Sequence, residues 1–284
     1  MAKSLVAWIA GDQFDLLREV VAESGLELAA IGSTTIDDAQ QLAASLGTHV
    51  AGDLRDMLAS SGDAVAWIAE PGAYDPSLCP LIRSRTQPTI TSTPLAGTLE
   101  ELGQAVLDEP AARFVPLTRR AAAFGPARDE PGSVTALAAT LCCDKGQGGL
   151  AGRLFDGMDF LLAVLGQPQE VHAIYGGARV PASMSDLRGH MHVMVRFEHR
   201  RSGALLLSDT GPWFRIASAS TAEDTFTMQD QATEASLIAA ALRSEVLTPV
   251  PDAAGVHALC EAARLSCLTG SPENPQHIAE MLRY

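Results

Sequence analysis

Apolar and polar positions in the first third of the chain follow two alternating periods. Short apolar runs such as Leu5–Ala10 and Ala64–Ala69 predict strands buried on both faces, as in a parallel sheet. Between these runs, apolar residues recur every three or four positions, which predicts amphipathic helices. The expected strands are Leu5–Ala10, Glu27–Ile31, Ala64–Ala69 and Thr89–Thr91, and the expected helices are Phe14–Glu23, Ile36–Leu46, Leu54–Leu58, Pro76–Arg83 and Thr98–Leu107. This alternation predicts a Rossmann-like, doubly wound parallel sheet.

The period changes beyond Leu107, where strands dominate. The expected strands are Ser133–Thr140, Glu170–Tyr175, His192–Glu198, Leu205–Ser208, Arg215–Ala219 and Thr225–Met228. The expected helices are Leu154–Leu165, Thr233–Arg243 and Gly255–Leu268, after a loop or frayed helix at Arg119–Pro131. This series predicts an α/β domain with an open, mostly antiparallel sheet and helices on one face. We therefore divide the chain into a Rossmann-like domain, residues 1–112, and a C-terminal α/β domain, residues 113–284.

Composition narrows the possible partners. The chain has 284 residues, 47% of them hydrophobic, and a net charge of −14. Such a charge argues against binding to nucleic acid or to anionic membranes. No apolar run reaches the length of a membrane span, and the start of the chain is interpreted as a first strand rather than a signal peptide. Five cysteines without framework spacing predict reduced thiols in the cytoplasm.

The turn after the first strand is where a dinucleotide fingerprint would stand. The chain has Ala10-Gly11-Asp12-Gln13-Phe14-Asp15 there instead of G-x-G-x-x-G. Glycines allow the backbone to approach a pyrophosphate closely, whereas Asp12 adds negative charge and is interpreted as a helix N-cap. After the second strand, Ser33 stands where an acidic ribose ligand is expected. Dinucleotide binding is therefore not predicted from these residues.

Five segments in the same order give the chain a resemblance to the Gfo/Idh/MocA oxidoreductase family. They are residues 63–71 (DAVAWIAEP), 93–96 (TPLA), 113–116 (RFVP), 148–166 (GGLAGRLFDGMDFLLAVLG) and 241–270. The resemblance implies a Rossmann domain and a C-terminal domain whose sheet face makes dimers. It also implies NAD(P)-dependent oxidation or reduction of sugars and polyols. If a dinucleotide binds, the resemblance places it against Gly11, Asp12, Ser33, Glu70 and Pro71.

The resemblance also identifies the positions at which hydride chemistry needs particular side chains. A base must move a hydroxyl proton and a cation must hold negative charge. Thr93 stands at the family's lysine position, Gly152 at an aspartate and Asp156 at a histidine four residues later, while Asp159 matches a helix aspartate. Asp75 replaces another histidine. Thr93, Gly152, Asp156 and Asp159 thus define the expected substrate pocket, and Asp156 is the sole candidate catalytic residue.

The histidines and cysteines give weaker indications of a functional site. His190 and His192 share a strand face and His172 lies on another strand, but no ligand spacing completes a metal site. Cys142 and Cys143 precede Lys145, which could lower a thiol pKa, although buried inert cysteines are the simpler interpretation. No metal is predicted.

Three functional hypotheses remain. The first is a diverged member of the fold that has lost dehydrogenase chemistry and acts as a binding or partner subunit. The second is an active NAD(P)-dependent sugar or polyol oxidoreductase with relocated proton-transfer groups, Asp156 among them. The third is a cofactor-free lyase or isomerase that uses Asp156 and Asp159.

The alternation in Met191–Phe197 bears on assembly. Met191, Val193, Val195 and Phe197 share one face, whereas the other face carries Met194 between polar residues. Leu205–Leu207 place apolar groups on both faces of the next strand. One face of this sheet can pack on helices, whereas the apolar side chains of the other face need a partner to cover them. The chain is therefore expected to dimerise through this sheet, with itself or with a catalytically intact relative.

Overall fold

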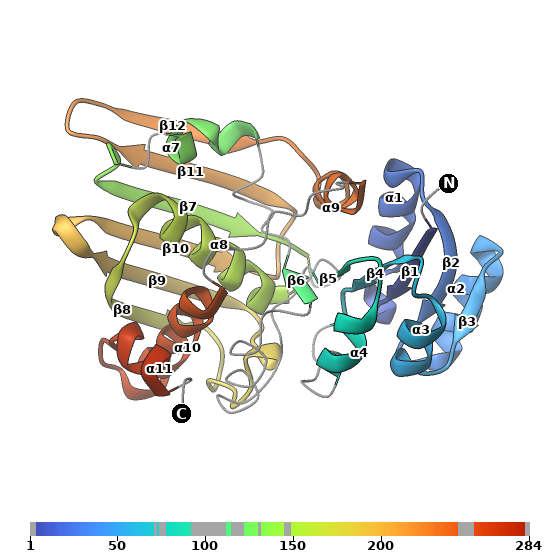
Figure 1. Ribbon diagram of the computed structural model, residues 1–284. Coiled ribbons are helices and arrows are strands. Elements are labelled where there is room, and N and C mark those ends of the chain that lie inside the picture. Colours follow the sequence, from blue (N-terminus) through green and yellow to red (C-terminus); the bar gives the residue numbers. More distant parts are fainter. Residues whose placement is uncertain are drawn as a thin grey trace.

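The described residues of the computed structural model form two six-stranded sheets (Figure 1). The structure describes residues 4–70, 73, 78–91, 112–114, 122–129, 132–144, 149–243 and 253–281. The first sheet is parallel throughout, and the second is antiparallel except where β10 pairs with β7. The predicted fold class is confirmed: a Rossmann-like parallel sheet is joined to an open, mostly antiparallel sheet.

The first sheet has the strand order β3-β2-β1-β4-β5-β6. Its strands are β1 (Ser4–Trp8), β2 (Glu27–Gly32), β3 (His49–Ala51), β4 (Val65–Ile68), β5 (Thr89–Thr91) and β6 (Ala112–Phe114). Its helices are α1 (Phe14–Ser24), α2 (Ile36–Leu46), α3 (Leu54–Ser60) and α4 (Cys79–Ser84). Leu5 and Ala7 of β1 pack with α1 and α2, whereas Val6 and Trp8 pack with α3 and α4. The sheet is therefore covered on both faces, as its continuous apolar strands predict.

Local signals bound several of these helices, but the interpretation of Asp12 as a helix N-cap is wrong, because Gln13 is the N-cap residue of α1. The helices α1 and α2 end at Gly25 and Gly47, whose φ values of 67° and 66° suit a residue without Cβ. Helix α3 begins after Asp53, whose carboxylate accepts hydrogen bonds from two backbone N–H groups. The three-residue edge strand β3 was not predicted, because His49 and Val50 are exposed and show no alternation. The predicted helix Thr98–Leu107 lies outside the described residues.

The second sheet has the order β12-β11-β7-β10-β9-β8. Its strands are β7 (Ala136–Cys142), β8 (Pro168–Tyr175), β9 (His190–Phe197), β10 (Ser202–Ser208), β11 (Phe214–Ser220) and β12 (Thr225–Asp230). Its helices are the short α7 (Gly125–Asp129) with α8 (Gly149–Leu165), α10 (Ala253–Thr269) and α11 (Pro275–Met281). Alternate residues of β9 are buried and exposed along its whole length, because α8, α10 and α11 cover one face of this sheet only (Figure 1).

Sequence periodicity placed most elements of this half but missed some bounds. Helix α8 begins at Gly149, five residues before the predicted start, because Gly152 and Arg153 interrupt the apolar stripe although both are buried. Strand β7 begins at Ala136 and not at Ser133. Helix α11 was not predicted. Glu273, just before it, forms an isolated antiparallel bridge with Val171 at the outer edge of β8.

Helix α9 (Glu234–Arg243) connects the two halves of the chain. It follows the second sheet in sequence, but Ile238 and Leu242 pack in the same core as Leu17 and Val20 of α1. Figure 1 shows α9 between the two sheets, against α1. The predicted domain boundary at residue 112 falls on the first residue of β6, which pairs with β5 in the first sheet.

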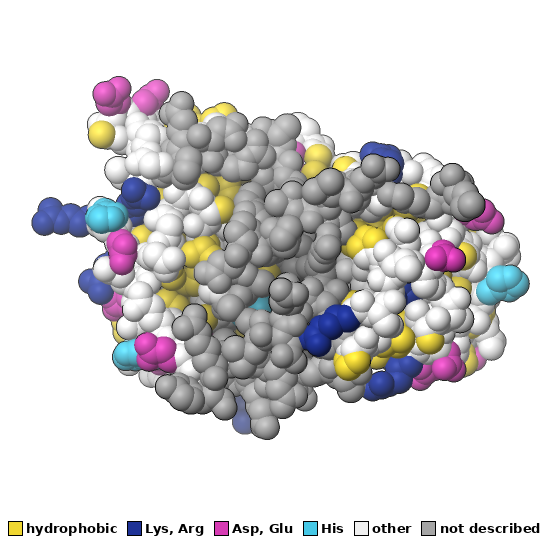
Figure 2. Space-filling view, viewed as in Figure 1, with side chains coloured by type: hydrophobic (Ala, Val, Ile, Leu, Met, Phe, Trp, Pro, Cys, Tyr) yellow, Lys and Arg dark blue, Asp and Glu magenta, His cyan; other side chains and the backbone are white. Residues whose placement is uncertain are grey.

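Exposed acidic and basic side chains are not separated into different regions on the side shown in Figure 2. Acidic and basic side chains of the described part are interspersed there around patches of apolar surface. No helix within the described residues has the length and apolarity that crossing a bilayer requires.

Candidate functional site

The carboxyl edge of the first sheet gathers the predicted cofactor-binding residues. Gly11 and Asp12 lie in a 3₁₀ turn, η1 (Gly11–Gln13), directly after β1. Ser33 follows β2 and Glu70 follows β4, while Pro71 lies outside the described residues. Since β1 lies between β2 and β4, these three strand ends meet at the switch point of the sheet, where α/β folds bind ligands.

The side chain of Gln13 is buried at this edge of the sheet. It is 1% exposed; its Oε1 accepts a hydrogen bond of 2.9 Å from the Ala10 N–H, and its Nε2 donates one of 3.1 Å to the carbonyl of Ala69. Gln13 therefore joins the end of β1 to the end of β4. The Ala10 N–H, which could otherwise donate a hydrogen bond to a phosphate oxygen, therefore already donates to a side chain of the protein.

A second contact spans the end of β1. The Glu70 carboxylate accepts a hydrogen bond from the Thr34 backbone N–H, at 3.2 Å, and another from the Thr34 hydroxyl. Thr34 follows β2 and Glu70 follows β4, so this bridge passes over the strand between them. On the other side, the Asp38 carboxylate of α2 lies against Gly11, where a Cβ atom would come within 2.6 Å of its Oδ2.

These residues do not fit a dinucleotide held in the Rossmann manner. A pyrophosphate needs open backbone N–H groups and favourable charge at the first turn. The described residues there provide the carboxyl groups of Asp12, Asp38 and Glu70, and the Ala10 N–H is already bonded to Gln13. Binding would require Gln13, or the bridge between Thr34 and Glu70, to move.

The expected substrate-pocket residues on the central helix are all buried. Gly152, Asp156 and Asp159 lie in α8, with Asp156 1% and Asp159 2% exposed. The two aspartates have different surroundings: the charge of Asp156 acts on Arg153 and Arg215, whereas the charge of Asp159 acts on Cys260 in α10, whose pKa burial and Glu261 also raise. Thr93 and Asp75, the other positions in this hypothesis, lie outside the described residues.

Asp156 belongs to a group of buried charges that we call the junction cluster: Arg153 and Asp156 of α8, Arg215 of β11, Asp230 of β12 and Glu234 of α9. Arg153 Nη2 lies 3.1 Å from Glu234 Oε1, and both side chains are 0% exposed. Arg215 forms an ion pair with Asp230, its cross-strand neighbour. Both guanidinium groups lie over the indole of Trp213, at 4.8 Å and 4.5 Å from the ring centre.

Burial and mutual attraction compete in the junction cluster. Burial raises the pKa of Glu234 to about 7, against the opposing charges of Arg153 and Arg215. Burial also lowers the pKa of Arg215, partly offset by Asp156 and Asp230. For Arg153, burial acts in the same direction, but the charges of Glu234, Cys143 and Asp156 outweigh it and raise the pKa.

Other candidate groups are not arranged for reaction. Burial raises the pKa of the Cys143 thiol to about 12, so the thiolate is scarce at neutral pH. Burial lowers the pKa of His257 to about 4, which leaves it neutral against the ring of Phe155. His172 and His192 lie on the exposed face of the second sheet, on β8 and β9. Within the described part of the chain, no group of three or more metal-ligating side chains comes together.

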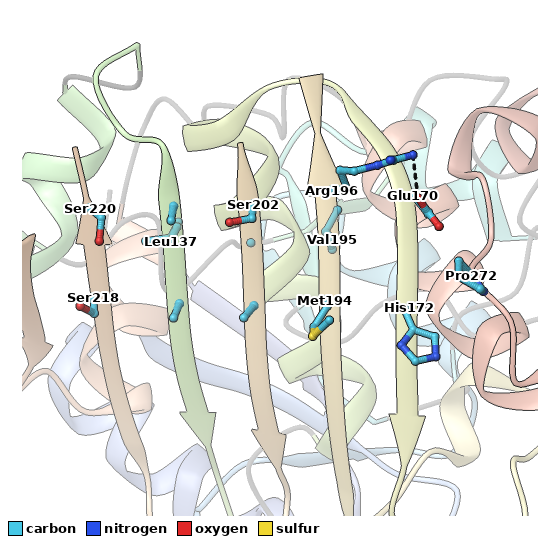
Figure 3. A pocket seen from close by; sticks show the side chains of 14 residues that line it. Leu137, Glu170, His172, Met194, Val195, Arg196, Ser202, Ser218, Ser220 and Pro272 are labelled. Carbon is cyan, nitrogen blue, oxygen red and sulfur yellow. Dashed lines mark ion pairs between the residues drawn. The ribbon is translucent and has the colours of Figure 1, made fainter. Parts of the chain in front are cut away.

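The exposed face of the second sheet forms a shallow apolar hollow of about 710 Å³ (Figure 3). Its floor consists of small side chains, Ala136 and Ala138 of β7 and Ala204 of β10, while Met194 rises beside it. Met194 is 62% and Ile174 63% exposed. An ion pair of 2.6 Å between Arg196 and Glu170 lies at one end, so these two charges neutralise each other.

The comparisons with known proteins identify the class of fold. Neither a family model nor a curated protein sequence matches the chain. Among solved structures, a myo-inositol dehydrogenase from Corynebacterium glutamicum superposes with a TM-score of 0.70 at 14% identity, over 96% of this chain and 98% of that one. The WlbA dehydrogenase from Bordetella pertussis, in complex with NADH and UDP-GlcNAcA, gives 0.69 at 16% identity over 96% and 98%. GenD2 from gentamicin A biosynthesis, in complex with NAD, gives 0.71 at 15% identity over 96% and 97%.

The chain therefore has the fold of the Gfo/Idh/MocA-type oxidoreductases, over nearly its whole length. This confirms the resemblance in the sequence as far as the fold is concerned. At such low sequence identities, the structural similarity shows only that this chain has the same fold. The cofactors and substrates named for those proteins are properties of those proteins.

Sequence reasoning missed the residues that close the first turn and the junction cluster. Gln13, Thr34 and Asp38 are ordinary loop or helix residues by sequence. Arg153 carried a detectable signal, since a cation within the apolar run from Leu150 to Leu165 has to find a buried partner. That partner, Glu234, is 81 positions away and has no sequence signal of its own.

Proposed function

We propose that this chain is a binding or partner subunit built on an oxidoreductase fold, without dehydrogenase chemistry of its own. The observation that carries the proposal is the set of contacts at the end of β1, where the buried Gln13 side chain bonds the backbone of Ala10 and Ala69 and the Thr34–Glu70 bridge joins the residues after β2 and β4. A hydride-transferring enzyme of this fold needs that edge of the sheet to be open for its dinucleotide.

The central helix supports the same proposal. Gly152 has no side chain for proton transfer, and Asp156 is buried beside two arginines that hold it in an electrostatic network. A base has to reach a substrate hydroxyl within hydrogen-bond distance. Asp156 is 1% exposed, so a substrate hydroxyl does not reach it unless the surrounding side chains move.

The direct test is calorimetric titration of the purified chain with NAD⁺, NADH, NADP⁺ and NADPH, together with mass spectrometry of any dinucleotide released on denaturation. We expect no released dinucleotide and no saturable binding below about 1 mM, a free energy weaker than about −4 kcal/mol. Micromolar binding together with sugar-dependent reduction of the cofactor would refute the proposal.

The alternative function is an NAD(P)-dependent oxidoreductase acting on a sugar-like substrate, and the fold favours it. Asp156 is then the candidate proton acceptor. Under this alternative, turnover on a panel of sugars and polyols is measurable, Asp156→Asn abolishes it, and Asp159→Asn, the matched change three residues along, has a smaller effect. Turnover that Asp156→Asn leaves unchanged removes Asp156 from the mechanism.

For the partner, we propose a second copy of this chain or an intact relative, docked on the exposed face of the second sheet. The face carries both a hollow with a floor of small residues and the protruding Met194 and Ile174. In a two-fold pairing the protruding side chains of one copy can enter the hollow of the other. The charges at the hollow are already neutralised by the pair Arg196–Glu170.

We also propose that the chain works in the cytoplasm and binds neither nucleic acid nor membranes. The support is the net charge of −14 and the cysteines whose side chains are described, Cys142, Cys143, Cys260 and Cys267, which are all free thiols.

A further inference from the structure

The Arg153–Glu234 pair joins elements of the two sheets. Arg153 belongs to α8, which packs on the second sheet. Glu234 is the first residue of α9, whose apolar side chains lie in the core of the first sheet. The two side chains meet at 3.1 Å and are both inaccessible to solvent. This contact is therefore part of what holds α9, and the first sheet with it, against α8.

The charges that face Glu234 come from several elements. Arg153 and Asp156 face it from α8 and Arg215 from β11, while Asp230 on β12 is held by Arg215. The Cys143 thiol, just after β7, is a further titratable group there, and it is uncharged at neutral pH. Helix α1, which packs along α9, turns Leu17 and Val20 toward it and keeps its four charged residues exposed: Asp15, Arg18, Glu19 and Glu23.

Glu234 is only half satisfied at this position. Its Oε1 pairs with Arg153, but its buried Oε2 has no hydrogen-bond partner among the described residues. A buried carboxylate with one unsatisfied oxygen carries a large desolvation penalty. This penalty is the reason why burial raises the pKa of Glu234 to about 7, in spite of two neighbouring arginines.

We propose that the junction of α8 and α9 is a proton-operated clasp. Glu234 takes up one proton as the junction closes and gives it up as α9 separates from α8. The clasp is a property of the fold and does not depend on whether the chain binds a dinucleotide.

The direction follows from linkage between protonation and docking. In a separated α9 the Glu234 carboxyl is hydrated and its pKa returns to its ordinary value near 4.5. Because the docked state binds the proton more tightly, docking is strongest at low pH and weakens as pH rises through the interval from 4.5 to 7. Above pH 7 both partners of the ion pair are charged, but α9 is held less tightly. The free-energy cost of burying the Glu234 charge is then larger than the stabilisation that the two arginines provide.

The test is hydrogen–deuterium exchange of peptides covering α9 in the full chain, at pH 6.0 and 8.5, corrected for the intrinsic pH dependence of exchange. We expect the opening equilibrium of α9 to increase roughly tenfold across this interval. Trp213 fluorescence provides a second readout, since both guanidinium groups lie over its indole, and Trp213→Phe assigns the signal.

The variants separate the clasp from general effects of pH. Glu234→Gln should abolish the pH dependence, and Arg153→Gln should move its midpoint upward, because the Arg153 charge lowers the pKa of Glu234. Glu170→Gln, which removes an exposed glutamate–arginine pair, should behave as wild type. A wild-type chain without pH dependence in α9, or a Glu234→Gln chain that retains it, overturns the inference; the wild-type measurement decides even if the variant fails to fold.

Discussion

At the scale of single residues, Gly32 shows how one missing Cβ shapes the candidate site. It ends β2, directly before Ser33, and a Cβ placed there would lie 2.3 Å from the Trp8 ring and 3.1 Å from the carbonyl oxygen of Ala51. Trp8 is 5% exposed, so its ring has little room to move. The loop that carries Ser33 and Thr34 therefore depends on a residue without a side chain.

We predict that Gly32→Ala lowers the free energy of unfolding by about 1–3 kcal/mol, the usual range for overpacking a core. Chemical denaturation followed by circular dichroism measures the change. Gly62→Ala is the matched control, because its Cβ meets no atom within 4 Å and its backbone is not in the left-handed region. Equal stabilities of the two variants would contradict the packing argument.

At the scale of elements, α8 and β9 show opposite uses of apolar side chains. Nearly every side chain of α8 is buried, charged ones included, whereas β9 buries every second residue and exposes Met194. Helix α8 lies in the interior of the molecule, whereas β9 has one face in the core and the other at the surface. The exposed side of β9 is where we expect the partner to dock.

We therefore predict that Met194→Glu dissociates the proposed dimer, because it places a charge on the apolar face where the copies meet. Light scattering after size exclusion at micromolar concentration measures the mass. Met281→Glu is the control, since Met281 is 53% exposed on α11, away from this face. A wild-type monomer would exclude the homodimer and favour a heterologous partner. A Met194→Glu dimer would move the interface elsewhere.

At the scale of the whole molecule, electrostatics oppose self-association. Each copy carries a net charge of −14, so two copies repel at long range although the proposed interface is locally neutral. Repulsion between exposed charges is screened over about 10 Å at 0.1 M salt. Charge thus acts on the rate and strength of pairing, while the apolar face provides the attraction.

The expected consequence is that the dimer dissociation constant decreases several-fold when monovalent salt increases from about 20 mM to 300 mM. Analytical ultracentrifugation over a dilution series measures it. Weaker association at high salt would mean that ion pairs between the copies, rather than the apolar hollow, provide the attraction.

Much of the fold could be predicted from the sequence. The apolar runs and helical spacing of residues 5–69 identified three strands and three helices, although not the edge strand β3. The alternation at Met191–Phe197 identified the buried face of β9, which the structure confirms. These elements are predictable because a strand or helix buried on a known side has a fixed period. Their strand ends also located the carboxyl edge of the first sheet.

What the sequence by itself determined is the set of elements, their faces and the architecture they imply. Only the tertiary structure decided the state of the site: that Gln13 connects β1 with β4, that Thr34 reaches Glu70 across β1, and that Arg153 meets Glu234. The physical reason is that periodicity comes from burial of each segment against a core. Contacts between polar side chains depend instead on which strand ends and helices the folded sheets bring together, and that is not encoded in any single segment.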